Sequence, residues 1–426
     1  MKQLFPPIQV PKSFLVQFRE EISRCVKCGA CRAVCPAFLR EREESLSPRG
    51  RMALVRAVLD GKLPLSAIFK DRLATCTGCL ACETACPSGV PVTKIIQAAK
   101  EQALQESGPG IITATIAEVV KHPALFRTAA WFGPLLLHYA RGQGIRKGRP
   151  ADRSPDKMRV VQGEVTRSKK KVSKGTIVFF PGCAVEHFQP EIGKAAISVL
   201  NRIGYEVIIP NDLKCCGRPV LSLGDRRSAS ELAKHNRTQF AKLECDAIVT
   251  ACASCSLTFK KEYPRLLPPG SSPVVLDIHE FLATRIGEAG LASLPKTVTW
   301  HDPCHLGRGQ GLSKTARDIL SAVPGLTLVE MRNADRCCGF GGVMRMTHRN
   351  LSDGIAEDKA RNIITTGVST VVTGCPGCRL QIADSLRRTA LNIDIEVVHT
   401  VQLLEEAFEM QSPDRDTEKA LCGCPQ

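Results

Sequence analysis

Apolar residues recur along the chain at two spacings, one typical of helices and one typical of strands. Within residues 46–61, Met52, Val55 and Leu59 recur at helical intervals between a proline and a glycine, which predicts a helix. From about residue 173, short runs rich in β-branched residues alternate with helical stretches such as residues 192–203. This alternation predicts βα units with parallel strands.

The β-rich region repeats itself after about 120 residues. The run 176–183 matches 297–304, and 247–252 matches 370–375. A repeat of this kind predicts two α/β lobes related by an internal duplication. In each lobe cysteines directly follow predicted strands, where α/β sheets place their ligand-binding loops.

A connector separates these lobes from the N-terminal region. Residues 111–120 predict a helix, whereas the apolar stretch 131–139 is interrupted by glycine and proline. We interpret the stretch as a helix pair packed on a neighbouring domain, with a dock for a membrane subunit or a quinone as the alternative. No apolar run is long enough for a transmembrane helix, and no signal-peptide pattern is present. We therefore expect a cytoplasmic protein, peripheral on the inner face of the membrane in the alternative interpretation.

Positive charge is concentrated in the connector. The formal net charge is +16, and residues 141–174 contain twelve Lys or Arg against three acidic residues. Such a run is typical of a solvated linker, and acidic lipid headgroups or an acidic partner could also bind it. No nucleic-acid-binding motif accompanies the charge, so we expect no nucleic-acid partner.

Eighteen of the 21 cysteines fall into four groups. The two N-terminal groups share the pattern C-x2-C-x2-C-x3-C-P, and they are Cys25, Cys28, Cys31 and Cys35, then Cys76, Cys79, Cys82 and Cys86. In two-cluster ferredoxins the first three cysteines of each run hold one iron–sulfur cluster, and the fourth reaches the other cluster. This rule predicts two [4Fe–4S] sites, one of Cys25, Cys28, Cys31 and Cys86, the other of Cys76, Cys79, Cys82 and Cys35. Zinc and disulfides fit the spacings and the expected compartment less well.

The other two groups share a five-cysteine pattern with an adjacent pair followed by glycine. They are Cys183, Cys215, Cys216, Cys252 and Cys255, then Cys304, Cys337, Cys338, Cys375 and Cys378. Adjacent thiolates point apart along an extended chain, so they can reach different iron atoms of a larger, irregular cluster. Gly217 and Gly339 would let the backbone approach closely. Each set permits a further iron–sulfur cluster, so we expect one or two more.

Other candidate residues lie beside these groups. His301 and His305 flank Cys304, and each could donate a hydrogen bond to a cluster sulfur or simply satisfy a loop. Cys245 is expected to be a neutral thiol, and Cys422 and Cys424 to be surface thiols in a polar tail. The glycines after residue 306 do not follow the dinucleotide-binding pattern, so we expect no FAD or NAD site on this chain.

The repeated Cys-Cys-Gly pattern resembles the cysteine-rich (CCG) domain of heterodisulfide reductase catalytic subunits, in which five cysteines can bind a noncubane [4Fe–4S] cluster. The joined architecture resembles the iron–sulfur subunit of glycolate oxidase and related D-lactate dehydrogenases over nearly the whole chain. The stretches 46–61 and 301–311 are similar to that subfamily, and the iron–sulfur subunit of anaerobic glycerol-3-phosphate dehydrogenase shares the architecture. The basic connector, Cys422 and Cys424 depart from the family pattern.

Together these features predict an α/β protein with a helical N-terminal domain. The expected units are a two-[4Fe–4S] ferredoxin-type domain (1–107), a connector (108–172), two CCG domains (173–290 and 291–410) and a tail (411–426). The resemblance implies an electron-transfer subunit, not catalytic alone, which passes electrons from an FAD-binding 2-hydroxyacid dehydrogenase subunit to a quinone or another membrane acceptor. A disulfide reductase acting at a CCG-bound cluster is the alternative, and a non-redox module with structural clusters is a third.

Overall fold

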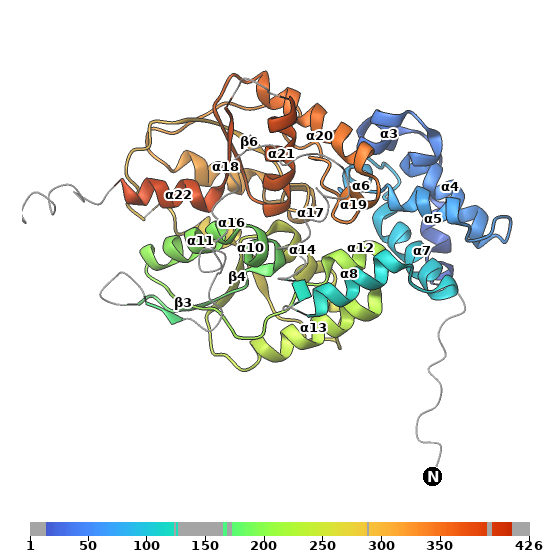
Figure 1. Cartoon of the computed structure of the whole chain (residues 1–426), viewed down its shortest axis with the longest axis horizontal. Helices are drawn as coiled ribbons and strands as arrows, with labels where there is room; N and C mark the ends of the chain where they lie inside the picture. Colours follow the sequence, from blue (N-terminus) through green and yellow to red (C-terminus); the bar gives the residue numbers. More distant parts are fainter. Residues whose placement is uncertain are drawn as a thin grey trace, which may run out of the picture.

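The structure is a computed structural model of the chain, and it describes residues 14–122, 125–126, 165–167, 173–287, 289–389 and 394–410. The stretch 131–139, most of the basic run, Cys422 and Cys424 lie outside the described residues. The described residues form an N-terminal helical domain and two α/β lobes (Figure 1).

Short helices build the N-terminal domain. Its elements are η1 (Val16–Phe18), α1 (Arg19–Ser23), α2 (Ala30–Val34), α3 (Pro36–Glu41), η2 (Glu44–Leu46), α4 (Pro48–Leu59), α5 (Ala67–Ala74), α6 (Ala81–Thr84) and α7 (Val92–Ser107). Helix α4 confirms the helix predicted within residues 46–61. It begins after Ser47, whose Oγ accepts a hydrogen bond from the Gly50 amide at 2.9 Å and so satisfies one free donor of the first turn. Its buried Met52 and Val55 pack into the domain core, as the helical spacing requires.

The first lobe contains a five-stranded sheet in the order β1-β3-β2-β4-β5. Its elements are β1 (Val165–Thr166), β2 (Thr176–Phe179), α10 (Gly182–Phe188), α11 (Pro190–Arg202), β3 (Glu206–Ile208), α12 (Arg218–Leu223), α13 (Arg226–Phe240), β4 (Ala247–Thr250), α14 (Ala253–Lys261), α15 (Tyr263–Leu266), β5 (Val275–Asp277) and α16 (Ile278–Leu282). All neighbouring strands are parallel except β1, which pairs antiparallel with β3. The predicted connector helix is present as α8 (Ile111–Lys121), and it packs on α12 and α13.

The second lobe repeats this arrangement without the edge strand β1. Its sheet has the order β7-β6-β8-β9, and all its strands are parallel. The elements are β6 (Thr297–His301), α17 (Gly307–Gln310), α18 (Ser313–Ser321), β7 (Thr327–Leu328), α19 (Met344–Thr347), α20 (Arg349–Ile364), β8 (Thr370–Thr373), α21 (Pro376–Thr389), β9 (Glu396–His399) and α22 (Thr400–Glu409). The prediction of parallel βα units in two duplicated lobes is confirmed.

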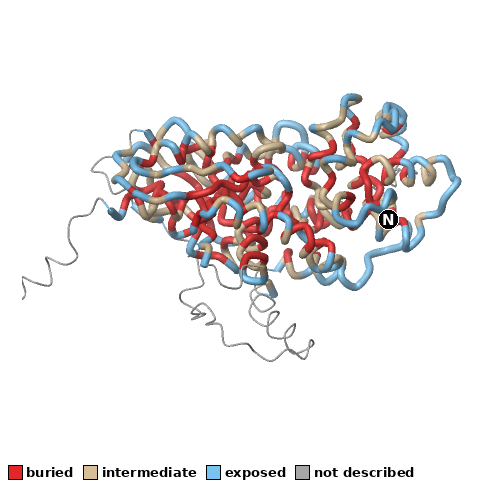
Figure 2. The backbone as a smooth tube through the Cα atoms, turned by 90° about the horizontal axis from the view of Figure 1, so that it is seen from above, coloured by how far each residue is buried: buried red, intermediate tan, exposed pale blue. Residues whose placement is uncertain are grey.

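The three units pack tightly against one another. One hydrophobic core contains residues of both lobes, and buried backbone (red in Figure 2) runs through the interior of the molecule. Helix α11 of the first lobe packs along α22 of the second (Figure 1). The N-terminal domain contacts both lobes, because α7 packs on α12 and α3 packs on α20. The Lys100 ammonium donates to the Ser222 carbonyl at 2.9 Å, and Arg40 lies 3.6 Å from Glu357. The exact limits of the three units stay a prediction.

Candidate iron–sulfur sites

The first N-terminal site is a partly open cavity in the loop before α2. Four of the predicted ligands, Cys25, Cys28, Cys31 and Cys86, line it together. The loop turns through left-handed backbone at Lys27 (φ 57°) and Gly29 (φ 89°). Arg49 holds this turn, since its guanidinium donates to the Lys27 carbonyl at 3.0 Å. Cys28 is exposed, so this site is open to solvent on one side.

The second N-terminal site is a neighbouring cavity between α3, α4 and α6. Its lining includes Cys35, Cys76, Cys79 and Cys82. The fourth cysteine of each run therefore lies with the first three cysteines of the other run, as the ferredoxin rule requires. Cys82 lines both cavities, so the two sites are immediate neighbours.

A buried arginine borders the second N-terminal site. Arg51 is 1% exposed, and its guanidinium donates to the Arg72 carbonyl at 2.9 Å and to Thr75 Oγ1 at 2.6 Å. Burial raises the pKa of the Cys35 thiol, whereas the Arg51 charge acts in the opposite direction. Arg51 thus supplies positive charge where a thiolate-bound cluster would add negative charge.

The first CCG site gathers its five cysteines at the carboxyl edge of the first sheet. Cys215 Sγ lies 3.6 Å from Cys183 Sγ, and Cys216 contacts both Cys215 and Cys255. The backbone approach at this site is close, because a Cβ on Gly182 would lie 2.9 Å from Cys255 Sγ.

The second CCG site repeats the geometry. Cys304 contacts Cys337, Cys338 contacts Cys378, and Cys375 lies against Cys378. Gly339 adopts left-handed backbone (φ 87°), and a Cβ there would lie 2.5 Å from the Ser352 carbonyl oxygen. Gly217 has the same left-handed backbone (φ 91°), so the conformation after each adjacent pair favours glycine.

The chemistry of these thiols fits cluster binding. Contacts with Cys183 and Cys216, followed by burial, raise the pKa of Cys215 well above its usual value. Hydrogen bonds from Cys215 and Cys255 lower the pKa of Cys216 instead. Five crowded, buried sulfurs cannot all be thiolates without cations between them, and iron supplies such cations.

The two predicted histidines have different surroundings. His301 is buried, neither ring nitrogen has a hydrogen-bond partner among the described residues, and its ligand atom lies within 4.8 Å of Cys338 Sγ and Cys378 Sγ. His305 has contacts on both sides, because Nδ1 lies 2.8 Å from Ser254 Oγ and Nε2 lies 3.3 Å from the Gly78 carbonyl oxygen. His305 therefore joins both lobes and the N-terminal domain.

The four cysteine groups form a continuous series. Cys82 lines both N-terminal cavities. Cys79 of the second N-terminal site contacts Cys337 of the second CCG site. Cys375 of that site contacts Cys252 of the first CCG site. The order from the exposed end is therefore first N-terminal, second N-terminal, second CCG and first CCG site.

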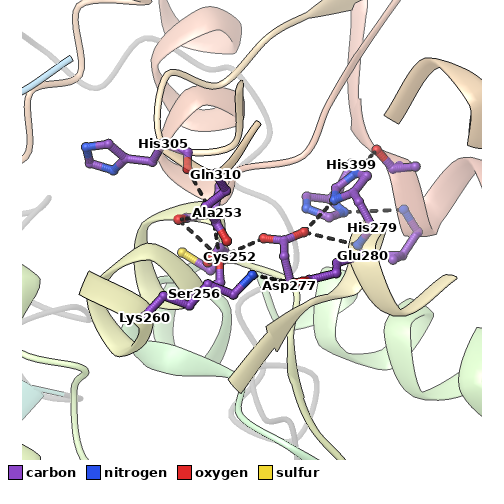
Figure 3. Close-up of polar contacts among 12 residues, drawn as sticks. Cys252, Ala253, Ser256, Lys260, Asp277, His279, Glu280, His305, Gln310 and His399 are labelled. Atoms are coloured by element: carbon purple, nitrogen blue, oxygen red, sulfur yellow. Dashed lines mark hydrogen bonds and ion pairs between the residues drawn. The ribbon is translucent and has the colours of Figure 1, made fainter. Parts of the chain in front are cut away.

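A buried polar network joins the lobes beside the last of these contacts (Figure 3). Asp277 Oδ1 accepts from the His279 amide and ring Nδ1 at 3.0 and 2.7 Å, and Oδ2 accepts from Ser256 Oγ at 2.8 Å. From the second lobe, Thr400 Oγ1 lies 2.9 Å from His279 Nε2, and Gln310 donates to Ser256 Oγ at 2.9 Å. These residues fix the position of one lobe against the other.

Sequence reasoning missed several buried polar residues around the sites, among them Arg51, Lys359, Asp277 and His399. A weak signal existed for two of them: Arg51 lies four residues before Val55, and Lys359 lies in the apolar row of α20. A long polar side chain in an apolar helix face indicates a buried partner. Cys245, by contrast, lies outside the four sites and is half-buried, and burial raises the pKa of its thiol.

Comparison with known proteins defines the class. The cysteine-rich domain (CCG) family model matches residues 177–260 and 298–383, and the 4Fe-4S dicluster domain model matches residues 21–90. The chain belongs to the family of iron–sulfur proteins that join a 4Fe-4S dicluster domain to two CCG domains, and it holds several [4Fe–4S] clusters.

The relatives are components of several oxidoreductases. The chain is 30% identical to a component of the fumarate reductase (CoM/CoB) of Methanothermobacter marburgensis, over 92% of this chain and 73% of the relative. It is 28% identical to the probable glycolate oxidase iron-sulfur subunit of Bacillus subtilis (94% and 97%). It is 30% identical to a component of the dihydromethanophenazine:CoB--CoM heterodisulfide reductase of Methanosarcina acetivorans (96% and 99%).

A solved structure shares the fold alone. A hypothetical protein from Helicobacter pylori aligns with a TM-score of 0.52 at 8% identity, over 94% of this chain and 77% of that chain.

Among the described residues, every helix is too short or too polar to cross a lipid bilayer.

Proposed function

We propose that this protein is the electron-transfer subunit of a flavin-dependent 2-hydroxyacid dehydrogenase complex, with glycolate or D-lactate as substrate. A partner chain carries the FAD, and a quinone or another membrane acceptor receives the electrons. The continuous series of four cysteine groups is the observation that carries the proposal. The named relatives, which include glycolate oxidase iron-sulfur subunits, support it.

The proposed ligands follow the groups that the fold brings together. Cys25, Cys28, Cys31 and Cys86 hold the first N-terminal cluster, and Cys35, Cys76, Cys79 and Cys82 hold the second. Five cysteines hold each CCG cluster, namely Cys183, Cys215, Cys216, Cys252 and Cys255, and Cys304, Cys337, Cys338, Cys375 and Cys378. Iron–sulfur clusters take up and release single electrons, and the surrounding protein sets their spacing and potentials.

The chain's own residues do the positioning. Gly182 lets the backbone come close to Cys255, and Gly217 and Gly339 supply the left-handed backbone after each cysteine pair. His305 ties the second N-terminal site to the lobes through the Gly78 carbonyl and Ser254. Contacts at Cys79–Cys337 and Cys252–Cys375 keep neighbouring sites adjacent, which rapid electron transfer requires.

A second function is favoured by one specific observation. The two CCG sites meet at Cys252 and Cys375, and the relatives include heterodisulfide reductase subunits. A disulfide reductase acting at a CCG-bound cluster is therefore the alternative. In that case the chain itself would turn over a disulfide when an artificial reductant is supplied.

One experiment separates the two functions. The tagged full chain is purified anaerobically from its own host, and copurified FAD is measured. D-lactate or glycolate is then added, and the cluster absorbance is followed. The proposal predicts a flavin-binding chain in the preparation and rapid bleaching of the clusters by one of the two acids. Absence of both, with turnover of a disulfide by the chain and reduced methyl viologen, would favour the alternative.

Two serine variants, one inside and one outside the cysteine groups, provide a matched comparison. Cys337→Ser interrupts the series at the contact with Cys79, so only the sites on the flavin's side of that contact should still bleach. Cys245→Ser removes a half-buried thiol outside all four sites, and it should behave like the wild type. Equal bleaching in both variants would contradict the proposed series.

A further inference from the structure

The two lobes are duplicates in backbone, but equivalent positions around their cysteines differ in chemistry. His301 stands three residues before Cys304, and Phe180 stands three residues before Cys183. Phe180 is fully buried and packs edge-on against the rings of Phe240 and Phe259, with centroids 6.1 and 5.0 Å away. The first lobe thus presents hydrocarbon where the second lobe presents an imidazole.

His301 has an unused hydrogen-bond donor at the second CCG site. Its side chain is 1% exposed, and neither ring nitrogen has a partner in the described part of the chain. A neutral imidazole carries one N–H, so the buried ring has a donor that the described residues do not use. Because the ring lies within 4.8 Å of Cys338 Sγ and Cys378 Sγ, this N–H is placed to donate toward sulfur.

A buried lysine reinforces the difference. Lys359 is the eleventh residue of α20, and the eleventh residue of α13 is Asn236. Lys359 Nζ donates to the carbonyls of Asn333 and Ala334 at 2.6 and 3.1 Å. Asn236 Nδ2 instead donates to the carbonyls of Lys214 and Cys215, both at 3.2 Å, at the first cysteine pair itself. Each side chain thus holds the backbone that leads into its cysteine pair, but only the second lobe does so with a cation.

The charge of this lysine is only weakly compensated. Lys359 is 2% exposed, and the ion pairs of the described residues do not include it. Asp335 adds some negative charge nearby, but its carboxylate is itself paired with Arg308 at 2.9 Å. Burial lowers the pKa of Lys359 to about 8, which leaves the ammonium form predominant at neutral pH. Its positive charge therefore acts through protein rather than through water.

One positive charge in the first lobe, that of Arg218, works against this difference between the lobes. Arg218 follows the first Cys-Cys-Gly triplet, where Phe340 follows the second. The Arg218 guanidinium lies 3.8 Å from the Glu262 carboxylate, and its side chain is 24% exposed. An acidic partner and contact with water both weaken its field at the cluster, whereas Lys359 has neither. The positive charge of the first lobe is therefore paired and partly solvated, whereas that of the second lobe is neither.

The residues that cap the last helix of each lobe differ in the same direction as His301 and Lys359. The first lobe has the Asp277 carboxylate before α16, and the second has His399 before α22. His399 Nδ1 accepts from the Val401 amide at 3.3 Å, so its Nε2 carries the proton, and this N–H has no partner among the residues described. An anion in the first lobe is matched by a neutral donor in the second.

We propose that the second CCG site holds its cluster at a higher reduction potential than the first, because His301 and Lys359 supply a hydrogen-bond donor and a positive charge that Phe180 and Asn236 do not. Positive charge and hydrogen bonds to sulfur stabilise the more negative, reduced cluster. The inference rests on the proposed cluster ligands, and it makes the second lobe the place where an electron resides at intermediate potentials.

The test is an anaerobic redox titration of the full chain, with sodium dithionite and mediator dyes and an EPR readout. Cys216→Ser and Cys338→Ser assign the two CCG signals, since each removes a ligand from one lobe. In the wild type, the second-lobe signal should be reduced first. Coincident midpoints for the two lobes, or an earlier first-lobe signal, would overturn the proposal.

Two variants test the named residues. Lys359→Met keeps the volume and removes the charge, and His301→Phe installs the first-lobe residue. At a fixed potential each should lower the ratio of reduced to oxidised second cluster about tenfold, which is about 59 mV for a one-electron couple. The first-lobe midpoint should stay unchanged. Lys296→Met is the matched control, because Lys296 pairs with Glu406 on the surface of the same lobe.

Iron content separates failure to fold from failure of the inference. If Lys359→Met and His301→Phe retain wild-type iron and unchanged midpoints, the inference is wrong. Should one of them lose iron, Phe180→His tests the inference from the other lobe, and it should raise the first-lobe midpoint. The titration uses dithionite, so its result is independent of whether a hydroxyacid flavoprotein is the physiological donor.

Discussion

Replacement of Asp277 should loosen the contact between the two lobes. The carboxylate is fully buried and accepts three hydrogen bonds, two from His279 and one from Ser256 (Figure 3). These two partners contact Thr400 and Gln310 of the second lobe. Asp277→Ala removes every acceptor at once and leaves the donors in a site closed to water.

The magnitude follows from the number of donors left without a partner. The Ser256 hydroxyl can turn to the Ala253 carbonyl, 3.2 Å away, so it does not lose its bond. The His279 ring can move its proton to Nε2 and donate to Thr400 Oγ1, 2.9 Å away, but the His279 amide has no such substitute, and an unsatisfied buried group costs about 1–3 kcal/mol. With about 1 kcal/mol more for the lost ring hydrogen bond, we expect Asp277→Ala to lower the free energy of unfolding by roughly 2–4 kcal/mol. Asp277→Asn keeps one carbonyl oxygen for His279 and should cost about 1 kcal/mol.

Thermal unfolding under anaerobic conditions measures this order of stabilities among the variants. One kcal/mol corresponds to roughly 2–4 °C for units of this size, so Asp277→Ala should lower the Tm by on the order of 10 °C. The Tm of Asp277→Asn should fall much less, and Ser256→Ala provides a matched control that removes a single hydrogen bond. Equal Tm values for Asp277→Ala and Ser256→Ala, at equal iron content, would refute the assignment of His279 as the stranded partner.

Other residues give further expectations. Burial raises the pKa of the Glu101 carboxyl to about 7 from its ordinary 4.5. The folded chain therefore binds this proton more tightly than the unfolded chain does, and the free energy of unfolding falls as the pH rises from about 4.5 to about 7. Glu101→Gln should therefore stabilise the protein by up to about 3 kcal/mol at about pH 8 and not at about pH 4.5. Urea unfolding at the two pH values measures this, and an equal shift of the urea midpoint at both would contradict the prediction. Arg51→Met should destabilise the N-terminal domain by about 2–4 kcal/mol, because the Thr75 hydroxyl and a backbone carbonyl lose a charged donor, and a urea midpoint like that of Arg56→Met would argue against it. Cys216→Ser should remove a CCG signal and leave ferredoxin-type EPR signals intact, whereas loss of all signals would show that the sites do not form independently.

Much of the fold was predictable because local patterns determine it. The helical spacing around Met52 and Val55 predicted α4, and the repeat of 176–183 at 297–304 predicted the duplicated sheets. Strand β1 was not predicted, since two residues carry too little pattern and their pairing with β3 is non-local.

The cysteine groups were predictable from spacing, but their mutual positions were not. The contacts Cys79–Cys337 and Cys252–Cys375 join segments far apart in sequence, and they depend on how three units pack. The same holds for Lys359, whose charge is explained by carbonyls that the fold brings to it. Local patterns identify the ligands, and tertiary packing sets their order.

The most direct test of the central claim is anaerobic iron and sulfide quantification on the purified chain, with EPR in oxidised and reduced states. The account predicts about sixteen iron atoms per chain, four for each of four clusters, with signals beyond the ferredoxin type. About eight iron atoms with ferredoxin signals alone would contradict it, because the CCG sites would then not be part of the electron path.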